Sequence, residues 1–298
     1  MTTFDAEAAV DLVWRRQGVW SRAAGDAKRR IVAARRAVAG LTIGAAVAGT
    51  AAAGIGENVP ARVLAVVAAA ALLLVPIVAR AASRESVQAW TRLRSVSEAL
   101  KADVHRHLAG VAPFAGADRD AVLLRRLDAL MDDVGDLMGH VVDRAPDARP
   151  LPEVSDVPSY LTARVRGQVE GYYLPMARRM ATRSERVGRA ATTVTVAGAL
   201  LSATVAVLGD PLGLTAWIGV TATVTTALVG YGAAQRYEHQ QIEYARTADQ
   251  LTRLLAVRAA GQGWADDDAV VAEAERIISL SNEGWMARMI ELDGAAQQ

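Results

Sequence analysis

The chain has 298 residues, a net charge of +1 and no cysteine, and 52% of its residues are apolar while 22% are charged. Without cysteine it has no disulfides, thiolate nucleophiles or cysteine-bound zinc sites. The near-neutral net charge gives no sign of a nucleic-acid-binding protein. The length is enough for two domains of ordinary size.

Four segments without a charged residue are the most informative feature in chain order. At 1.5 Å per residue, twenty helical residues span roughly 30 Å, about the thickness of the hydrocarbon core of a bilayer. Because only a few residues separate the members of each pair, the sequence predicts two transmembrane hairpins. The alternative is that these segments are helices buried in a soluble bundle. The alanine and glycine content of the first segment would also fit that alternative. The four segments are residues 37–56, 63–79, 190–209 and 211–235.

Basic residues flank the outer ends of both predicted hairpins, whereas the tips carry only Glu57, Arg62 and Asp210. By the positive-inside rule, both termini and the central segment are predicted to be cytoplasmic. Nearly all basic residues are arginine and alanine is abundant, which is typical of a GC-rich bacterial genome. The predicted location is therefore the bacterial plasma membrane, with several passes. The residues preceding the hairpins are Lys28, Arg29, Arg30, Arg35 and Arg36, and Arg178, Arg179, Arg183, Arg186 and Arg189.

The two halves of the chain share landmarks in the same order, which indicates an internal repeat. Trp20 aligns with Tyr173, Arg36 with Arg189, and the acidic run at Asp118 with the run at residue 266. Each half therefore reads as a basic helix, a hairpin and two cytoplasmic helices.

The repeat predicts the domain boundaries. The first hairpin unit covers residues 1–144, with cytoplasmic helices at 80–108 and 118–143. The second covers residues 160–298, with cytoplasmic helices at 236–259 and 266–293. Residues 145–159 contain four prolines and are predicted to form a linker, because proline at that density is incompatible with a helix.

Six apolar residues in the segment 118–143 are spaced 4, 3, 4, 3 and 4 apart, which is a heptad pattern. A one-sided apolar stripe needs a partner, and packing against a neighbouring helix of the same chain is the first interpretation. Self-assembly through this cytoplasmic seam stays open. The seam consists of Leu123, Leu127, Leu130, Val134, Leu137 and Val141.

No catalytic pattern is recognisable, since the sequence has no P-loop, no glycine-rich nucleotide fingerprint and no Ser–His–Asp arrangement. We therefore expect no enzyme, no cofactor-binding residue and no metal site. One acidic face could bring together carboxylates and an imidazole, but a solvated helix face is the favoured interpretation. That face contains Asp132, Asp133, Asp136 and His140.

The uncharged segments also lack the ionisable groups that proton relays and coupled transporters need. They carry small and hydroxyl-bearing residues instead. A hydroxyl can bond to the backbone one turn earlier, or it can line a pore when several subunits assemble. The candidate pore-lining or helix-packing residues are Thr195, Ser202, Thr215, Thr221 and Thr225.

The stretch Trp90-Thr91-Arg92-Leu93-Arg94, followed by Ser97-Glu98-Ala99-Leu100-Lys101 and residues 109–114, resembles the first unit of actinobacterial SLATT-domain proteins. These are SMODS- and SLOG-associating two-transmembrane effector domains. Residues 277–285 resemble the ending of the second unit of the same superfamily. The resemblance covers nearly the full chain, which is of a tandem type without a fused sensor domain. It implies a bacterial conflict-system effector that perforates or depolarises the membrane, with a nucleotide-signalling sensor protein as partner.

The sequence thus predicts an all-α membrane protein with two tandem two-helix transmembrane hairpins and long cytoplasmic helical arms. We expect a homo-oligomer in the lipid bilayer that forms an ion-conducting or membrane-perturbing pore in bacterial defence. The alternative is a structural membrane scaffold whose cytoplasmic helices recruit a partner. No cofactor and no nucleic acid are expected.

Overall fold

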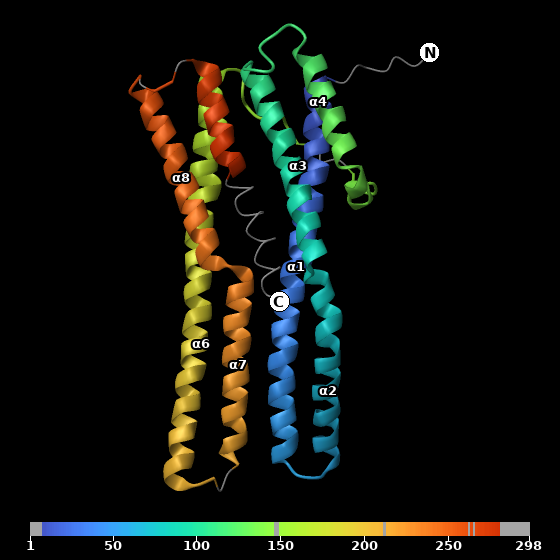
Figure 1. Cartoon of the computed structure of the whole chain (residues 1–298), viewed down its shortest axis with the longest axis vertical. Coiled ribbons are helices and arrows are strands. Elements are labelled where there is room, and N and C mark those ends of the chain that lie inside the picture. Colours follow the sequence, from blue (N-terminus) through green and yellow to red (C-terminus); the bar gives the residue numbers. More distant parts are fainter. Residues whose placement is uncertain (1–7, 146–148, 211–212, 262, 265, 281–298) are drawn as a thin grey trace. The chain divides into compact units, whose positions relative to one another are not determined.

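The computed structural model describes residues 8–145, 149–210, 213–261, 263–264 and 266–280 (Figure 1). All regular secondary structure within these residues is helical, which confirms the predicted all-α fold. The contacts divide the chain into two compact units. We call residues 29–83 and 178–241 the apolar unit, and residues 1–28, 84–177 and 242–298 the charged unit. This division by contacts groups segments from both sequence repeats in each unit.

Four long apolar stretches supply the helices of the apolar unit. They lie in α1 (Ala9–Gly54), α2 (Val59–Ala79), α6 (Leu174–Leu208) and α7 (Leu214–Gln235). Within the described residues these stretches are long and apolar enough to cross a membrane. At most 11% of the most apolar 18-residue window of each is buried. Since helices in a soluble core would be covered, the soluble-bundle alternative does not hold.

The helices of the apolar unit run in pairs, α1 with α2 and α6 with α7 (Figure 1), and small residues lie at their contacts. A side chain added at Gly49 of α1 would meet the Cβ of Ala68 of α2 at 3.8 Å. One added at Gly198 of α6 would meet the Oγ1 of Thr221 of α7 at 2.4 Å. The glycine at position 198 therefore lets α6 and α7 approach closely, whereas a side chain at position 49 would make an ordinary contact with Ala68.

Polar side chains at the turns begin the second helix of each pair. The Asn58 side chain accepts a hydrogen bond from the backbone N–H of Ala61, and Pro60 occupies the first turn of α2. The Asp210 carboxylate accepts hydrogen bonds from the backbone N–H groups of Leu214 and Thr215. Such caps satisfy N–H groups that have no partner within the helix.

The connections between the two units differ at the two ends of each apolar pair. α1 and α6 run from one unit into the other as unbroken helices. After α2, which contains Pro76, the chain forms the short 3-10 helix η1 (Arg80–Ala82) before α3 (Arg84–Ala109) begins. After α7, Arg236 adopts a left-handed conformation, with φ of 51°, before α8 (Tyr237–Ala259). A residue in this conformation ends a helix.

The charged unit is packed around a conventional apolar core. Besides parts of α1 and α8 it contains α3, α4 (Arg119–Asp133), η2 (Gly135–His140) and α5 (Val157–Tyr160). Two π-helical segments, η3 (Leu161–Arg166) and η4 (Val169–Tyr173), lead into α6, and residues 267–280 are helical. The side chains buried most deeply in the core include Trp20, Leu93, Leu100, Tyr160, Leu251 and Ile278.

Several predicted boundaries differ from the observed helices. The helix expected over 118–143 ends at Asp133 and continues as the 3-10 helix η2. Acidic residues at a helix C-terminus oppose the helix dipole, and a glycine follows at position 135. The proline-rich linker gives way to α5 at Val157, where Asp156 and Ser159 form a capping box. Of the helix expected over 266–293, residues 281–293 lie outside the described part of the chain.

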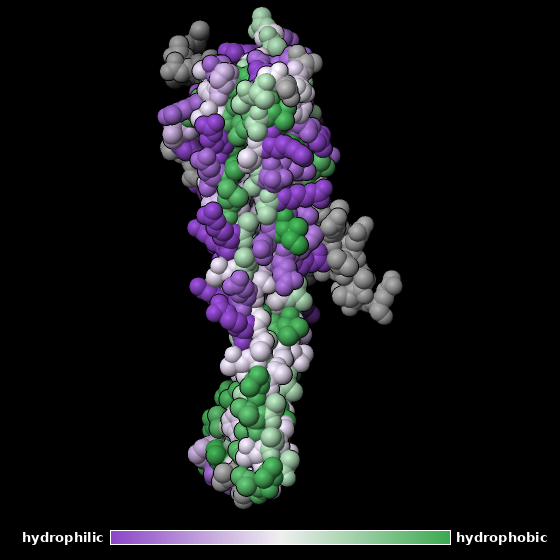
Figure 2. All heavy atoms as spheres, turned by 90° about the vertical axis from the view of Figure 1, so that its left-hand side faces the viewer, coloured by the Kyte–Doolittle hydropathy of each residue, from purple (hydrophilic) through white to green (hydrophobic). Residues whose placement is uncertain are grey.

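The distribution of hydropathy matches the two units. Figure 2 shows hydrophobic side chains gathered over the tips of the long helices, and hydrophilic side chains over most of the charged unit on the visible face. In the apolar unit, large side chains such as Val66, Leu73 and Leu200 are each at least 65% exposed. An apolar surface of this extent needs a non-aqueous surrounding.

Candidate functional site

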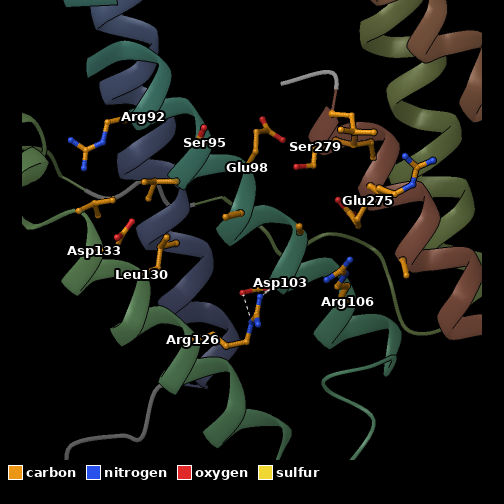
Figure 3. A pocket seen from close by; sticks show the side chains of 18 of the residues that line it. Arg92, Ser95, Glu98, Asp103, Arg106, Arg126, Leu130, Asp133, Glu275 and Ser279 are labelled. Carbon is orange, nitrogen blue, oxygen red and sulfur yellow. Dashed lines mark hydrogen bonds and ion pairs between the residues drawn. The ribbon is translucent and has the colours of Figure 1, made fainter. Parts of the chain in front are cut away.

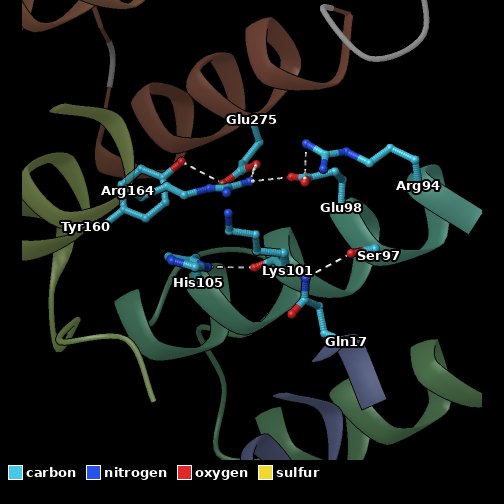
Figure 4. Close-up of polar contacts among 9 residues, drawn as sticks. All are labelled: Gln17, Arg94, Ser97, Glu98, Lys101, His105, Tyr160, Arg164 and Glu275. Atoms are coloured by element: carbon cyan, nitrogen blue, oxygen red, sulfur yellow. Dashed lines mark hydrogen bonds and ion pairs between the residues drawn. The ribbon is translucent and has the colours of Figure 1, made fainter. Parts of the chain in front are cut away.

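A buried ion pair lies at the centre of the charged unit. The Nε and Nη2 of Arg164 donate to the two carboxylate oxygens of Glu275, each at 3.0 Å (Figure 4). The hydroxyl of Tyr160 donates to the same carboxylate at 2.9 Å. The side chains of Arg164 and Glu275 are 1% and 5% exposed. Charges removed from water to this degree persist only when they are paired.

Local structure explains how these two side chains meet. Arg164 follows Tyr160 by one helical turn, so both point to the same side of the segment that α5 and η3 form. Glu275 lies in the helix over residues 267–280, whose first turn is capped by the Asp266 carboxylate through the N–H of Ala269, at 2.8 Å. Burial works against a charge on Glu275, but Arg164 lowers the pKa of this carboxyl below its ordinary value.

Helix α3 adds a second layer of charges. An oxygen of Glu98 lies 2.9 Å from the Nη2 of Arg94, and its other oxygen lies 3.9 Å from the Nη2 of Arg164. Burial and the guanidinium of Arg164 together lower the pKa of Lys101 to about 8 and that of His105 to about 4. His105 is therefore neutral at physiological pH, and its Nδ1 donates to the carbonyl of Lys101 at 2.7 Å.

A cavity of about 510 Å³ opens beside this cluster (Figure 3). It is lined by α3, by α4 and by the helix over residues 267–280, with Arg164 from η3. On its α4 side, Arg126 donates two hydrogen bonds to Asp103, at 2.8 and 3.0 Å. Its charged lining residues are Arg92, Glu98, Asp103, Arg106, Arg126, Asp133, Arg164, Glu275 and Arg276.

A second cavity, of about 610 Å³, lies within the apolar unit. It is lined by residues of α1 and α7 and by Ala79 and Ala82. Three threonines face it, Thr42, Thr223 and Thr226, and Arg35 and Tyr231 also line it. The Arg35 guanidinium donates to the carbonyl oxygen of Ala234 at 2.6 Å, which joins α1 to α7.

The hydroxyl residues singled out from the sequence lie elsewhere. The Oγ1 atoms of Thr195 and Thr225 are 3.4 Å apart across α6 and α7, and Thr221 faces Gly198. The hydroxyl of Ser202 donates to the carbonyl of Gly198, and the N–H of Thr215 to Asp210. These contacts favour the helix-packing role over the pore-lining role for Thr195, Thr221 and Thr225.

The heptad seam is covered within the chain. Five of its six residues are buried, and Leu130 is half-buried and lines the cavity of the charged unit with Val134. The seam spans α4, η2 and Val141 rather than one helix. Its burial favours packing within the chain over self-assembly through this surface. Among the predicted acidic face, Asp136 accepts hydrogen bonds from Arg92 at 2.5 and 2.9 Å.

Sequence reasoning missed Arg164 and Glu275 as a pair. A signal was present, because each occupies an otherwise apolar helix stripe. Arg164 follows Val157 and Tyr160 at helical spacing, and Glu275 lies between Val271 and Ile278. A charged residue on an apolar stripe requires a partner of opposite sign, although the stripe does not identify that partner.

Open apolar helices joined to a packed, charged helical unit define a helical membrane protein. Residues 160–285 match the family model of the SMODS and SLOG-associating 2TM effector domain 1, SLATT_1. This match confirms, over residues 160–285, the resemblance to SLATT domains found in the sequence. Residues 19–121 match a model described as a protein of unknown function, DUF4231. Comparisons with curated proteins and with solved structures give no match.

Proposed function

We propose that this protein is a membrane effector of a bacterial conflict system that assembles as a homo-oligomer and makes the plasma membrane permeable to ions. The proposal rests on the exposed side chains and the cavity of the apolar unit. Its helices leave large apolar side chains exposed and also line an open cavity faced by three threonines. The SLATT match supports the effector role.

The threonine-faced cavity supports an ion path. Hydroxyl groups can replace part of the hydration shell of an ion without the cost of a buried charge. The Oγ1 of Thr42 donates to Val38 and that of Thr223 to Gly219, so their lone pairs remain available as acceptors. In this proposal, neighbouring copies close the cavity into a continuous path, and no catalytic step is involved.

The distribution of basic residues supports an orientation with both termini and the charged unit in the cytoplasm. Arg80 and Arg84 follow α2, and Arg236 follows α7. The turns at the other ends carry only Glu57, Arg62 and Asp210. Movements of the charged unit would then gate the path from the cytoplasmic side.

Leakage from vesicles tests this proposal. The purified full chain is reconstituted into liposomes that contain a self-quenching dye, and conductance is recorded in planar bilayers. We expect dye release and discrete conductance steps. Replacing Thr223 and Thr226 by valine keeps their shape but removes the hydroxyls, and it should lower conductance by about tenfold, the factor that 1.4 kcal/mol represents. Vesicles that stay intact at every protein density would overturn the proposal.

The matched control is Thr193→Val. Thr193 lies on α6, is exposed, and donates to the backbone carbonyl of Arg189 at 2.9 Å, so it resembles Thr223 locally but does not line the cavity. Its conductance should equal that of the unmodified protein. Equal losses in both variants would point to a change in helix packing.

The second candidate function is a membrane scaffold whose charged unit recruits a partner. Two large apolar side chains of this unit favour it, since Val142 is 73% and Ile242 is 61% exposed. A stoichiometric complex of the full chain with a nucleotide-signalling sensor protein, combined with impermeable vesicles, would support the scaffold over the pore.

A further inference from the structure

The cavity of the charged unit contains buried hydrogen-bond donors that have no acceptor. Among the described residues that line it, the buried side-chain atoms without a partner are the Nε of Arg106 and the Nη1 of Arg164. Arg164 is 1% exposed, so the solvent does not reach its side chain freely. A buried N–H group without an acceptor is unfavourable, and a charged one more so.

Three of the four carboxylates that line the same cavity are already engaged, and the fourth, Asp133, is exposed. Glu275 accepts from Arg164 and Tyr160, Asp103 accepts twice from Arg126, and Glu98 lies in an ion pair with Arg94. The groups that still need a partner are therefore donors, the Nε of Arg106 and the Nη1 of Arg164, and they need a hydrogen-bond acceptor. A cation would find no free carboxylate among these three, whereas an anion would meet two guanidinium donors.

The charges around Arg164 also favour the binding of an anion over that of a cation. Arg94, Lys101 and Arg164 stand against two acids, Glu98 and Glu275, and Arg106 adds a further positive charge at the cavity wall. The lowered pKa of Lys101, to about 8, results from burial and from the nearby Arg164. An anion placed among these groups would relieve their mutual repulsion.

We propose that this cavity binds a small soluble molecule through a phosphate or similar oxyanion group, held by Arg106 and Arg164. Guanidinium groups donate parallel N–H bonds that match the oxygens of phosphate. The cavity volume of about 510 Å³ leaves space for a body larger than the oxyanion itself. The site lies in the charged unit, and its occupancy does not depend on the proposed ion path.

A soluble ligand fits better than a lipid headgroup. Arg106 lies 22 residues after Arg84, where α3 begins. At 1.5 Å per residue, this is about 33 Å along the helix axis. We therefore take a soluble molecule as the ligand, and the two nanodisc compositions described below test a lipid headgroup as the other source.

Calorimetry on the intact protein tests the site. The full chain is placed in nanodiscs of phosphatidylcholine and titrated with inorganic phosphate, with chloride at equal ionic strength as the reference titration. We expect saturable binding at one site per chain. A parallel set of nanodiscs contains phosphatidylglycerol. Unchanged phosphate affinity there supports the soluble source, and its loss would show that a lipid headgroup occupies the cavity instead.

Arg106→Gln is the informative variant, because it removes one of the two buried cavity donors that have no acceptor. It should weaken phosphate binding at least tenfold while the unfolding temperature without phosphate stays unchanged. Arg276→Gln is the matched control, since Arg276 lines the same cavity but is paired with Glu273. Its affinity should stay within about twofold, a difference below 0.5 kcal/mol.

Two outcomes would overturn the proposal. One is a titration with phosphate that shows no saturation in either nanodisc. The other is an equal affinity in Arg106→Gln and in the unmodified protein. Dye release from vesicles is measured separately, so a failure of the proposed ion path and a failure of this site give different results.

Discussion

The apolar unit and the charged unit are both built from long helices, but they bury opposite kinds of side chain. In the charged unit an arginine and a glutamate are buried together with leucine, valine and tryptophan side chains. In the apolar unit, valine and leucine face outward and small residues mark the helix contacts. The difference shows that each unit is matched to its own surrounding, water in one case and lipid in the other.

The largest effect is expected from breaking the buried ion pair. Glu275→Gln keeps the side-chain shape but leaves the charge of Arg164 uncompensated, so the free energy of unfolding should fall by about 3–5 kcal/mol. Guanidinium denaturation of the full chain in detergent, followed by tryptophan fluorescence, measures the change. The control, Glu273→Gln, removes the surface pair with Arg276 in the same helix. It should cost about 0–1 kcal/mol. If both variants lost a similar free energy of unfolding, the buried pair of Glu275 with Arg164 would contribute no more than the surface pair.

A charge on the open face of the apolar unit gives the next largest effect. Val67 lies near the middle of α2 and is 52% exposed. Val67→Arg should make membrane insertion less favourable by about 2.5–3.5 kcal/mol, whereas an exposed site in water would tolerate it. Insertion efficiency, read from the fraction retained in membranes after alkaline carbonate extraction, measures this. Val67→Leu serves as the neutral control, and unaltered insertion of the arginine variant would argue against lipid contact at this face.

The close contact of α6 and α7 is expected to be sensitive to one added methyl group. Gly198→Ala places a Cβ 2.4 Å from the Oγ1 of Thr221, which should destabilise the pair by about 1–3 kcal/mol. Thr221→Ala in the same chain should recover most of the loss. Gly188→Ala lies on α6 with open space around it and should be neutral or slightly stabilising. Thermal unfolding in detergent provides the measurement, and a loss that Thr221→Ala does not recover would refute the contact.

The smallest effect concerns pH and the charged unit alone. His105 has a pKa of about 4 in the folded protein, against an ordinary value of about 6.5 in an unfolded chain. Between these values only the unfolded chain binds the proton, so lowering the pH favours unfolding. Stability should fall by about 1 kcal/mol for each pH unit below 6.5. The lowered pKa values of Glu98 and Glu275 add their own losses only at lower pH.

His105→Gln should flatten this dependence between about pH 6.5 and pH 5, a range that lies between the pKa of His105 in the unfolded chain and its lower pKa in the folded protein. His140→Gln is the control, because His140 is exposed at the end of η2 and far along the chain from the ion pair. Denaturation curves at a series of pH values give the slopes. An equal slope in His105→Gln and in the unmodified protein would exclude His105 as the source.

The apolar helices were predictable because composition alone specifies them. α2 contains all of the predicted segment 63–79, and α6 contains the predicted segment 190–209 except its last residue. About twenty residues without a charge have few alternatives to a membrane-spanning helix. The buried pair was not predictable, because Arg164 and Glu275 are 111 positions apart and meet only through tertiary packing. The end of α4 at Asp133 was not predictable either, because the heptad pattern continues without a break to Val141.

The unequal joints between the two units have a mechanical consequence. A helix without an internal proline or distortion is stiff, whereas a 3-10 turn or a residue in the left-handed conformation can act as a hinge. α1 passes from the charged unit into the apolar unit without a proline, whereas η1 and the left-handed Arg236 interrupt the helices where the chain returns. The pair α1 and α2 therefore has one stiff and one flexible connection to the rest of the chain.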